Sequence, residues 1–129
     1  MSIVTLPSRP LPHPPAVYSQ AVRVANLLFV AGQPGVEFNT GKASDEFELQ
    51  ARQAFENLST VLRAYGSRLE NVVKTTVWLR DATSFDSLNR LYAEYFPKNA
   101  PARSTPIVAL PKPNLQISIE AIAIMGDSV

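Results

Sequence analysis

The order of hydrophobic patterns along the 129 residues predicts an α+β fold, with helices packed on one side of a mixed β-sheet. Some segments alternate apolar and polar residues with a period of two, as half-buried strands do. Others repeat apolar residues every three or four positions, as amphipathic helices do. The resulting order is strand, strand, helix, strand, helix, strand, strand. A chain of this length is most simply one domain, which we place at residues 15–129.

Residues 1–14 are expected to form an extended arm, because proline fixes φ and lacks an N–H donor. Residues 1–15 contain five prolines: Pro7, Pro10, Pro12, Pro14 and Pro15. His13, the only histidine, lies among them. We interpret it as a solvated arm residue, since a histidine that acts in acid–base chemistry needs an orienting partner.

Two β-like runs follow the arm, at 20–24 and 27–31, with Ala25-Asn26 between them as a tight hairpin turn. Gly32 and Gly35 bracket Gln33-Pro34, which predicts a further turn. Asn39-Thr40-Gly41 predicts a loop.

The first helix is predicted over residues 45–65. Its apolar face consists of Phe47, Ala51, Phe55, Leu58, Leu62 and Tyr65. Asp45 with Glu48 three residues later predicts an N-cap and its reciprocal partner, and Gly66 predicts the end of the helix.

The second half of the chain repeats the alternation of strand and helix. A strand is predicted over 72–80, with Val73, Thr75, Val77 and Leu79 on one face and Lys74, Thr76 and Trp78 on the other. A helix is predicted from Phe85 to Phe96, closed by Pro97. The last strand runs through 115–122, so Ser118 and Glu120 share one face about 7 Å apart.

Composition narrows the function classes. The net charge is +1 with no basic stripe, which argues against a nucleic-acid partner. The absence of cysteine excludes disulfides and thiolate chemistry, and a single histidine argues against a transition-metal site. No phosphate-binding or dinucleotide glycine loop and no G-x-S-x-G elbow occurs. The longest apolar run, 27–31, is far below the ~20 residues that span a bilayer, and no secretory signal precedes it. We therefore expect a soluble cytoplasmic protein.

Arg103 is the most informative polar residue. It follows Pro101-Ala102 and precedes Ser104-Thr105, and its guanidinium can hold a planar carboxylate through two parallel hydrogen bonds. Other polar residues near strand ends could join it: Tyr18, Gln33, Asn89, Thr105, Ser118 and Glu120. Each also has a structural interpretation. Arg103 could form a salt bridge, Tyr18 could simply pack, Asn89 could be exposed, and Thr105 could be an ordinary strand residue.

Several segments together carry a family resemblance. They are Tyr18-Ser19-Gln20-Ala21, Leu28-Phe29-Val30-Ala31-Gly32-Gln33, residues 51–58 (ARQAFENL), residues 72–79 (VVKTTVWL), residues 89–96 (NRLYAEYF), Pro101-Ala102-Arg103-Ser104-Thr105 and residues 119–123 (IEAIA). In this order and spacing the chain resembles the RidA/YjgF family of reactive enamine/imine deaminases.

The resemblance implies a chorismate-mutase-like α+β fold that assembles as a homotrimer, with clefts between subunits that bind a small carboxylate. Members of the deaminase kind hydrolyse 2-aminoacrylate and related 2-imino acids to 2-keto acids and ammonia, without metal or cofactor. By resemblance, Arg103 holds the carboxylate, Tyr18 closes the cleft from a neighbouring subunit, and Asn89 lines it. Thr105 stands where many members have cysteine, and the backbone at Gly32 and Thr105 contacts substrate or water.

Two positions depart from the family pattern. Ala31 stands where deaminases usually carry serine, and Ser118 stands where they usually carry the glutamate that positions the attacking water. Glu120 faces the same side as Ser118 but lies about 7 Å along the strand, too far to replace that glutamate without a shift. We expect an imine or enamine deaminase. The alternatives are a trimer that binds keto or imino acids without turnover and a regulatory trimer with a vestigial cleft.

Overall fold

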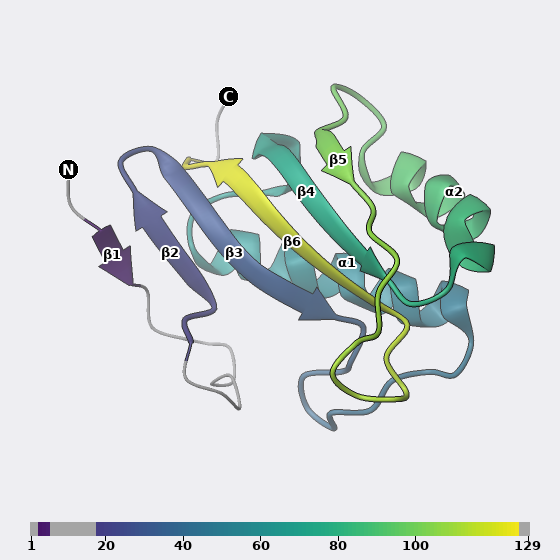
Figure 1. Ribbon diagram of the computed structural model, residues 1–129. Helices are drawn as coiled ribbons and strands as arrows, with labels where there is room; N and C mark the ends of the chain where they lie inside the picture. Colours follow the sequence, from purple (N-terminus) through teal and green to yellow (C-terminus); the bar gives the residue numbers. More distant parts are fainter. Residues whose placement is uncertain (1–2, 6–17, 127–129) are drawn as a thin grey trace.

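The computed structural model describes residues 3–5 and 18–126, which form a six-stranded mixed sheet with two α-helices (Figure 1). The strands are β1 (Ile3–Thr5), β2 (Ala21–Val24), β3 (Leu27–Pro34), β4 (Val72–Leu79), β5 (Ala102–Ser104) and β6 (Ile117–Ile124). Their order in the sheet is β1-β2-β3-β6-β4-β5, and only β4 and β5 pair in parallel. The predicted α+β fold, a mixed sheet with helices on one side, is confirmed. The arm's prolines and His13 lie outside the described residues.

The start of the predicted arm is a paired strand. Ile3–Thr5 pair antiparallel with β2, placing Ile3 opposite Val24. These residues are extended, as expected of the arm, but they pair with the sheet rather than standing apart from it. β2 is otherwise an edge strand with free backbone groups, and a short strand that adds to it satisfies them.

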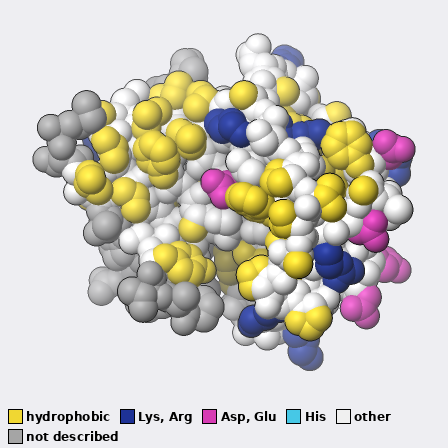
Figure 2. Space-filling view, viewed as in Figure 1, with side chains coloured by type: hydrophobic (Ala, Val, Ile, Leu, Met, Phe, Trp, Pro, Cys, Tyr) yellow, Lys and Arg dark blue, Asp and Glu magenta, His cyan; other side chains and the backbone are white. Residues whose placement is uncertain are grey.

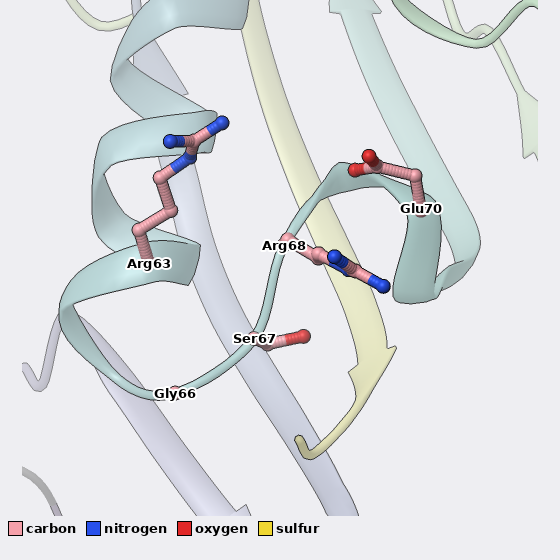
Figure 3. A pocket seen from close by; sticks show the side chains of 5 residues that line it. All are labelled: Arg63, Gly66, Ser67, Arg68 and Glu70. Atoms are coloured by element: carbon pink, nitrogen blue, oxygen red, sulfur yellow. The ribbon is translucent and has the colours of Figure 1, made fainter. Parts of the chain in front are cut away.

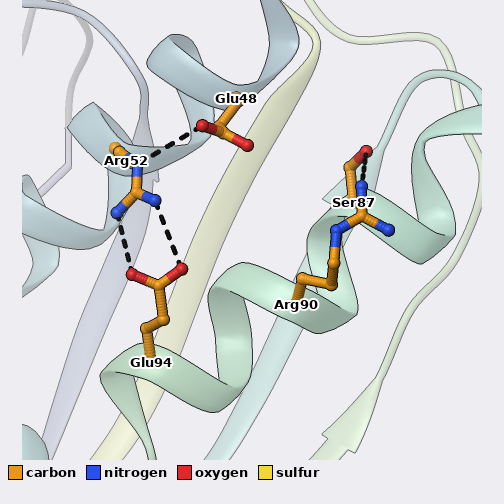
Figure 4. Close-up of polar contacts among 5 residues, drawn as sticks. All are labelled: Glu48, Arg52, Ser87, Arg90 and Glu94. Atoms are coloured by element: carbon orange, nitrogen blue, oxygen red, sulfur yellow. Dashed lines mark hydrogen bonds and ion pairs between the residues drawn. The ribbon is translucent and has the colours of Figure 1, made fainter.

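The two helices are α1 (Phe47–Ala64) and α2 (Phe85–Tyr95). A 3₁₀ turn, η1 (Leu69–Asn71), follows α1, and another, η2 (Ala82–Ser84), precedes α2. α1 crosses β3 and β6 on one face of the sheet, and α2 lies beside α1 towards the β4–β5 end (Figure 1). Phe55 of α1 is fully buried and stacks on Tyr95 of α2 at 4.6 Å between ring centroids. On the surface, Arg52 forms a bidentate ion pair with Glu94, at 3.1 and 3.2 Å (Figure 4).

The ends of α1 agree only partly with the sequence. The N-cap is Glu46, with no side-chain cap bond, so the predicted Asp45–Glu48 capping box is wrong. Ser44 Oγ accepts from the Glu46 N–H at 3.1 Å just ahead of the helix, which begins at Phe47. The predicted stop at Gly66 is confirmed. Its φ of +85° lets the Gly66 and Ser67 N–H groups reach the last carbonyls of the helix.

β3 is longer than predicted, because Gln33 and Pro34 belong to it rather than to a turn. A register shift between Val30 and Gln33 absorbs the irregularity. Gly35 is required by close packing against α1 rather than by a turn. A Cβ at this position would lie 2.0 Å from the Gln50 carbonyl oxygen of α1. A second register shift, between Val72 and Lys74, leaves Val73 exposed, so the prediction that it shares a face with the buried Thr75, Val77 and Leu79 is wrong.

The two faces of the sheet differ in character. Thr75, Val77 and Leu79 are buried beneath the helices, whereas the opposite face is uncovered in the described residues. On this open face an apolar patch crosses β2, β3 and β6, and it is seen from the front in Figure 2. We call it the open-face patch; its residues are Val22, Val24, Leu27, Phe29, Ile122 and Ile124. Within the described part of the chain, neither helix has the length and apolarity to cross a bilayer.

Candidate functional site

Arg103 is held against α2. Its Nη2 donates to Asn89 Oδ1 at 2.8 Å, and its guanidinium lies 4.8 Å from the Tyr92 ring centroid and 5.5 Å from that of Phe85. Among the described residues no carboxylate lies within ion-pair distance of this guanidinium. The structural interpretation as a salt bridge is therefore not supported within that part of the chain. A guanidinium carries five N–H donors, and Asn89 takes one of them.

The ring of Tyr92 packs against the Arg103 guanidinium. Its hydroxyl and Thr75 Oγ1 are 2.6 Å apart in a buried hydrogen bond that links α2 to β4. Burial raises the pKa of Tyr92 above its ordinary value, while the Thr75 bond and the Arg103 charge oppose this rise. The ring therefore stays neutral at physiological pH and offers its face to the cation.

Sequence reasoning missed the two rings, although a signal for them exists. Phe85, Asn89 and Tyr92 are spaced four and three residues apart, so they lie on one face of α2. The unpredicted element is the parallel pairing of β5 with β4, which sets Arg103 beside Thr75 on the helix side.

Ser118 and Glu120 lie on the open face, as their alternation predicts. Ser118 pairs in register with Trp78, and Glu120 pairs with Thr76. Glu120 Oε1 accepts from the Trp78 indole N–H at 2.9 Å. Trp78 had not been identified as a partner, and its bond ties the Glu120 carboxylate to the strand residue that pairs with Ser118.

Gly32 and Ser118 are in close approach. A Cβ on Gly32 would lie 2.8 Å from Ser118 Oγ, with no other group within 4 Å. The Ser118 hydroxyl therefore occupies the space that the glycine leaves on β3. The sequence identified both residues, and the structure brings them together.

Ala31 is half-buried within the irregular part of β3. Its N–H donates to the Gln20 carbonyl at 2.9 Å, and its own carbonyl accepts from Gln33 Nε2 at 3.0 Å. Gln33 also donates to Gln20 Oε1 at 2.9 Å, in a buried pair. Gln33 therefore shapes this stretch of backbone. Tyr18 is exposed at the start of the described segment, and Thr105 is half-buried directly after β5.

Lys74 adds a cation to the open face. Its Nζ donates to the Thr75 carbonyl at 3.0 Å and to Ser104 Oγ at 3.2 Å. The sequence did not identify it, because the contact depends on the β4–β5 pairing. Among the described residues, no three His, Cys, Asp or Glu side chains gather as a metal-binding group.

Comparison with known proteins gives consistent matches. The family model described as Endoribonuclease L-PSP matches residues 9–125. A RutC family protein of Pyrococcus horikoshii is 43% identical over 114 residues, covering 87% of this chain and 90% of that protein. The human 2-iminobutanoate/2-iminopropanoate deaminase is 42% identical over 111 residues, covering 84% and 80% respectively.

Solved structures share the fold. The crystal structure of the Escherichia coli YjgF gene product superimposes with a TM-score of 0.85 at 34% sequence identity, covering 94% of this chain and 98% of that one. The superposition covers nearly the whole of both chains, so the fold is one that is seen experimentally.

Proposed function

The chain belongs to the RidA/YjgF (Endoribonuclease L-PSP) family, and on that premise we propose that it hydrolyses 2-imino acids, or the enamines that tautomerise to them, to 2-keto acids and ammonia. The human relative's name specifies imines of this class.

The observation that carries the proposal is the environment of Arg103. Asn89 and the rings of Phe85 and Tyr92 hold its guanidinium, and no described carboxylate neutralises it. A restrained guanidinium can grip a carboxylate with little further loss of side-chain freedom. A 2-imino acid presents that carboxylate next to the carbon that water must attack.

The reaction needs little from the protein beyond positioning. Water adds to the imine carbon, its proton passes to the imine nitrogen, and the resulting carbinolamine loses ammonia as the C=O bond forms. No electrons are transferred and no co-reactant is needed. Anchoring the carboxylate holds the neighbouring imine carbon in one orientation within the site. Such orientation can supply much of the rate gain.

We further propose that the site is completed by a second copy of the chain in a homotrimer. Arg103 faces α2, whereas Ser118, Glu120 and Gly32 belong to the opposite side of the sheet. One chain therefore does not present both groups to one substrate. The open-face patch supports assembly, because Leu27 and Phe29 are 38% and 41% exposed in the single chain.

One observation favours binding without turnover as a second candidate. Ser118 provides a hydroxyl and no carboxylate, and the nearby Glu120 carboxylate is bonded to Trp78. A trimer with the Arg103 anchor but no placed base would capture 2-keto acids without hydrolysing imines.

A panel of imines generated in situ by an amino-acid oxidase separates the two candidates. The oxidase releases the imine at a known rate, and the lifetime of the imine is compared with and without the purified protein. A deaminase shortens the lifetime of at least one imine of the panel. Unchanged lifetimes across the panel, together with measurable 2-keto acid binding, would replace the deaminase by the binding protein.

A further inference from the structure

A pocket lies at the C-terminal end of α1, and the residues that line it include none of those that contact Arg103. It has a volume of about 340 Å³ and is lined by Arg63, Gly66, Ser67, Arg68 and Glu70. Figure 3 shows Arg63 and Glu70 on its two sides, with Ser67 and Arg68 between them.

The charged groups of this pocket are not paired with one another. No ion pair within 4.0 Å joins Arg63, Arg68 or Glu70 to a described residue. Among the described residues, the buried Nε of Arg68 has no hydrogen-bond acceptor, and the buried Oδ1 of Asn71, in the adjoining η1 turn, has no donor. Buried polar atoms are usually satisfied, so this turn holds hydrogen-bonding capacity that the described part of the fold does not use.

The backbone makes the pocket a fixed feature. Gly66 and Ser67 donate to Arg63 and Leu62 carbonyls, Gly126 donates to the Gly66 carbonyl at 2.8 Å, and Ser67 Oγ donates to the Ile124 carbonyl at 2.8 Å. These bonds fix the loop between α1 and η1 on the end of β6. The backbone positions from which the two arginines and the glutamate project therefore follow from the fold.

The arrangement of charge decides between ligand classes. Two guanidinium groups suit a carboxylate. A simple anion would also meet the Glu70 carboxylate and the negative end of the α1 dipole, both of which oppose it. A ligand that carries an ammonium group beside its carboxylate removes the conflict with Glu70, because its ammonium can face that carboxylate.

We propose that this pocket binds a free α-amino acid as its zwitterion, with the carboxylate on Arg63 and Arg68 and the ammonium on Glu70. The proposal does not depend on the activity at Arg103. It assigns the chain a separate small-molecule site at the C-terminal end of α1.

The test uses L-alanine with two analogues that each lack one charge, propanoate and ethylamine, titrated into the full chain. Amide NMR signals of Gly66, Ser67 and Gly126 report the pocket. The titrations are run in an Arg103→Ala background so that binding at that residue does not contribute. L-Alanine should shift these signals saturably, and each analogue should bind at least roughly tenfold more weakly, since each lacks a charge-assisted hydrogen bond.

Arg68→Gln and Glu70→Gln should each weaken L-alanine binding at least roughly tenfold, and the surface change Arg90→Gln should leave it unchanged. Equal binding of propanoate and L-alanine would overturn the zwitterion assignment. No saturable shift of these amides at roughly 50 mM L-alanine would overturn the site itself.

Discussion

Arg103 and Glu120 lie on opposite faces of the sheet. β5 places Arg103 beside Thr75, beneath α2, whereas β6 places Glu120 beside Thr76 on the open face. Thr75 and Thr76 are consecutive on β4 and so point to opposite faces, which separates Arg103 from Glu120. Both residues had been identified from the sequence as members of one site. The separation explains why a second chain is required in the proposed mechanism.

The shared site predicts a trimer that depends on the open-face patch. Light scattering should give three times the 14.1 kDa mass of the chain. Phe29→Asp places a charge within the patch and should yield monomers with little imine hydrolysis, because burying an unpaired charge is costly. Leu49→Asp is the control, since Leu49 is exposed on α1. Full activity from a Phe29→Asp monomer would contradict the shared site.

Ser118→Glu tests whether the missing acid limits the rate. The new carboxylate would stand over Gly32, which has no side chain to obstruct it, and beside Glu120 on the same face. Like charge near Glu120 raises the pKa of a carboxyl group, which suits a base at neutral pH. We expect the turnover number for imines to rise by roughly tenfold or more. An unchanged turnover number would mean that catalysis does not pass through this position.

Tyr92→Phe tests the buried bond that supports Arg103. The change leaves Thr75 Oγ1 without its 2.6 Å partner, at a cost of about 1–3 kcal/mol in unfolding free energy. Thr75→Val combined with Tyr92→Phe removes both polar groups and should cost less than the sum of the single changes. Urea unfolding of the four proteins measures this coupling, and strict additivity would argue against it.

Gly35→Ala should severely destabilise the fold. Its Cβ would overlap the Gln50 carbonyl oxygen at 2.0 Å, so α1 would have to move away from β3. We expect a loss of more than ~3 kcal/mol. Gly41→Ala is the matched control, because nothing lies within 4 Å of its Cβ and only its φ of +71° opposes the change. Thermal unfolding of both variants should show a much larger decrease for Gly35→Ala.

The sequence predicted the elements whose periodicity is regular. The alternation that set Ser118 and Glu120 on one face, and the spacing that set Phe55 and Leu58 into the core, were both confirmed. Several errors came from local irregularities. The register shifts at Val72–Lys74 and Val30–Gln33 leave no mark in a simple alternation, and the N-cap of α1 is Glu46 rather than Asp45. The pairing of Ile3–Thr5 with β2 joins distant segments, which no local pattern encodes.

The site was predictable as a set of residues but not as a geometry. Arg103, Asn89, Ser118 and Glu120 were identified from residue type and resemblance. Their division between two faces depends on the parallel β4–β5 pairing, a contact between distant segments that no local pattern encodes. The ring partners of Arg103 follow from the same pairing, since it brings β5 against α2.

The central claim is that Arg103 anchors the carboxylate of an imine substrate. The most direct measurement compares kcat/KM for imine hydrolysis in the unaltered protein, Arg103→Ala and the control Arg90→Ala, which changes an exposed arginine on α2. The account predicts a loss of at least roughly a hundredfold for Arg103→Ala, corresponding to about 2.7 kcal/mol of transition-state binding, and no loss for Arg90→Ala. Equal kcat/KM in Arg103→Ala and the unaltered protein would contradict it.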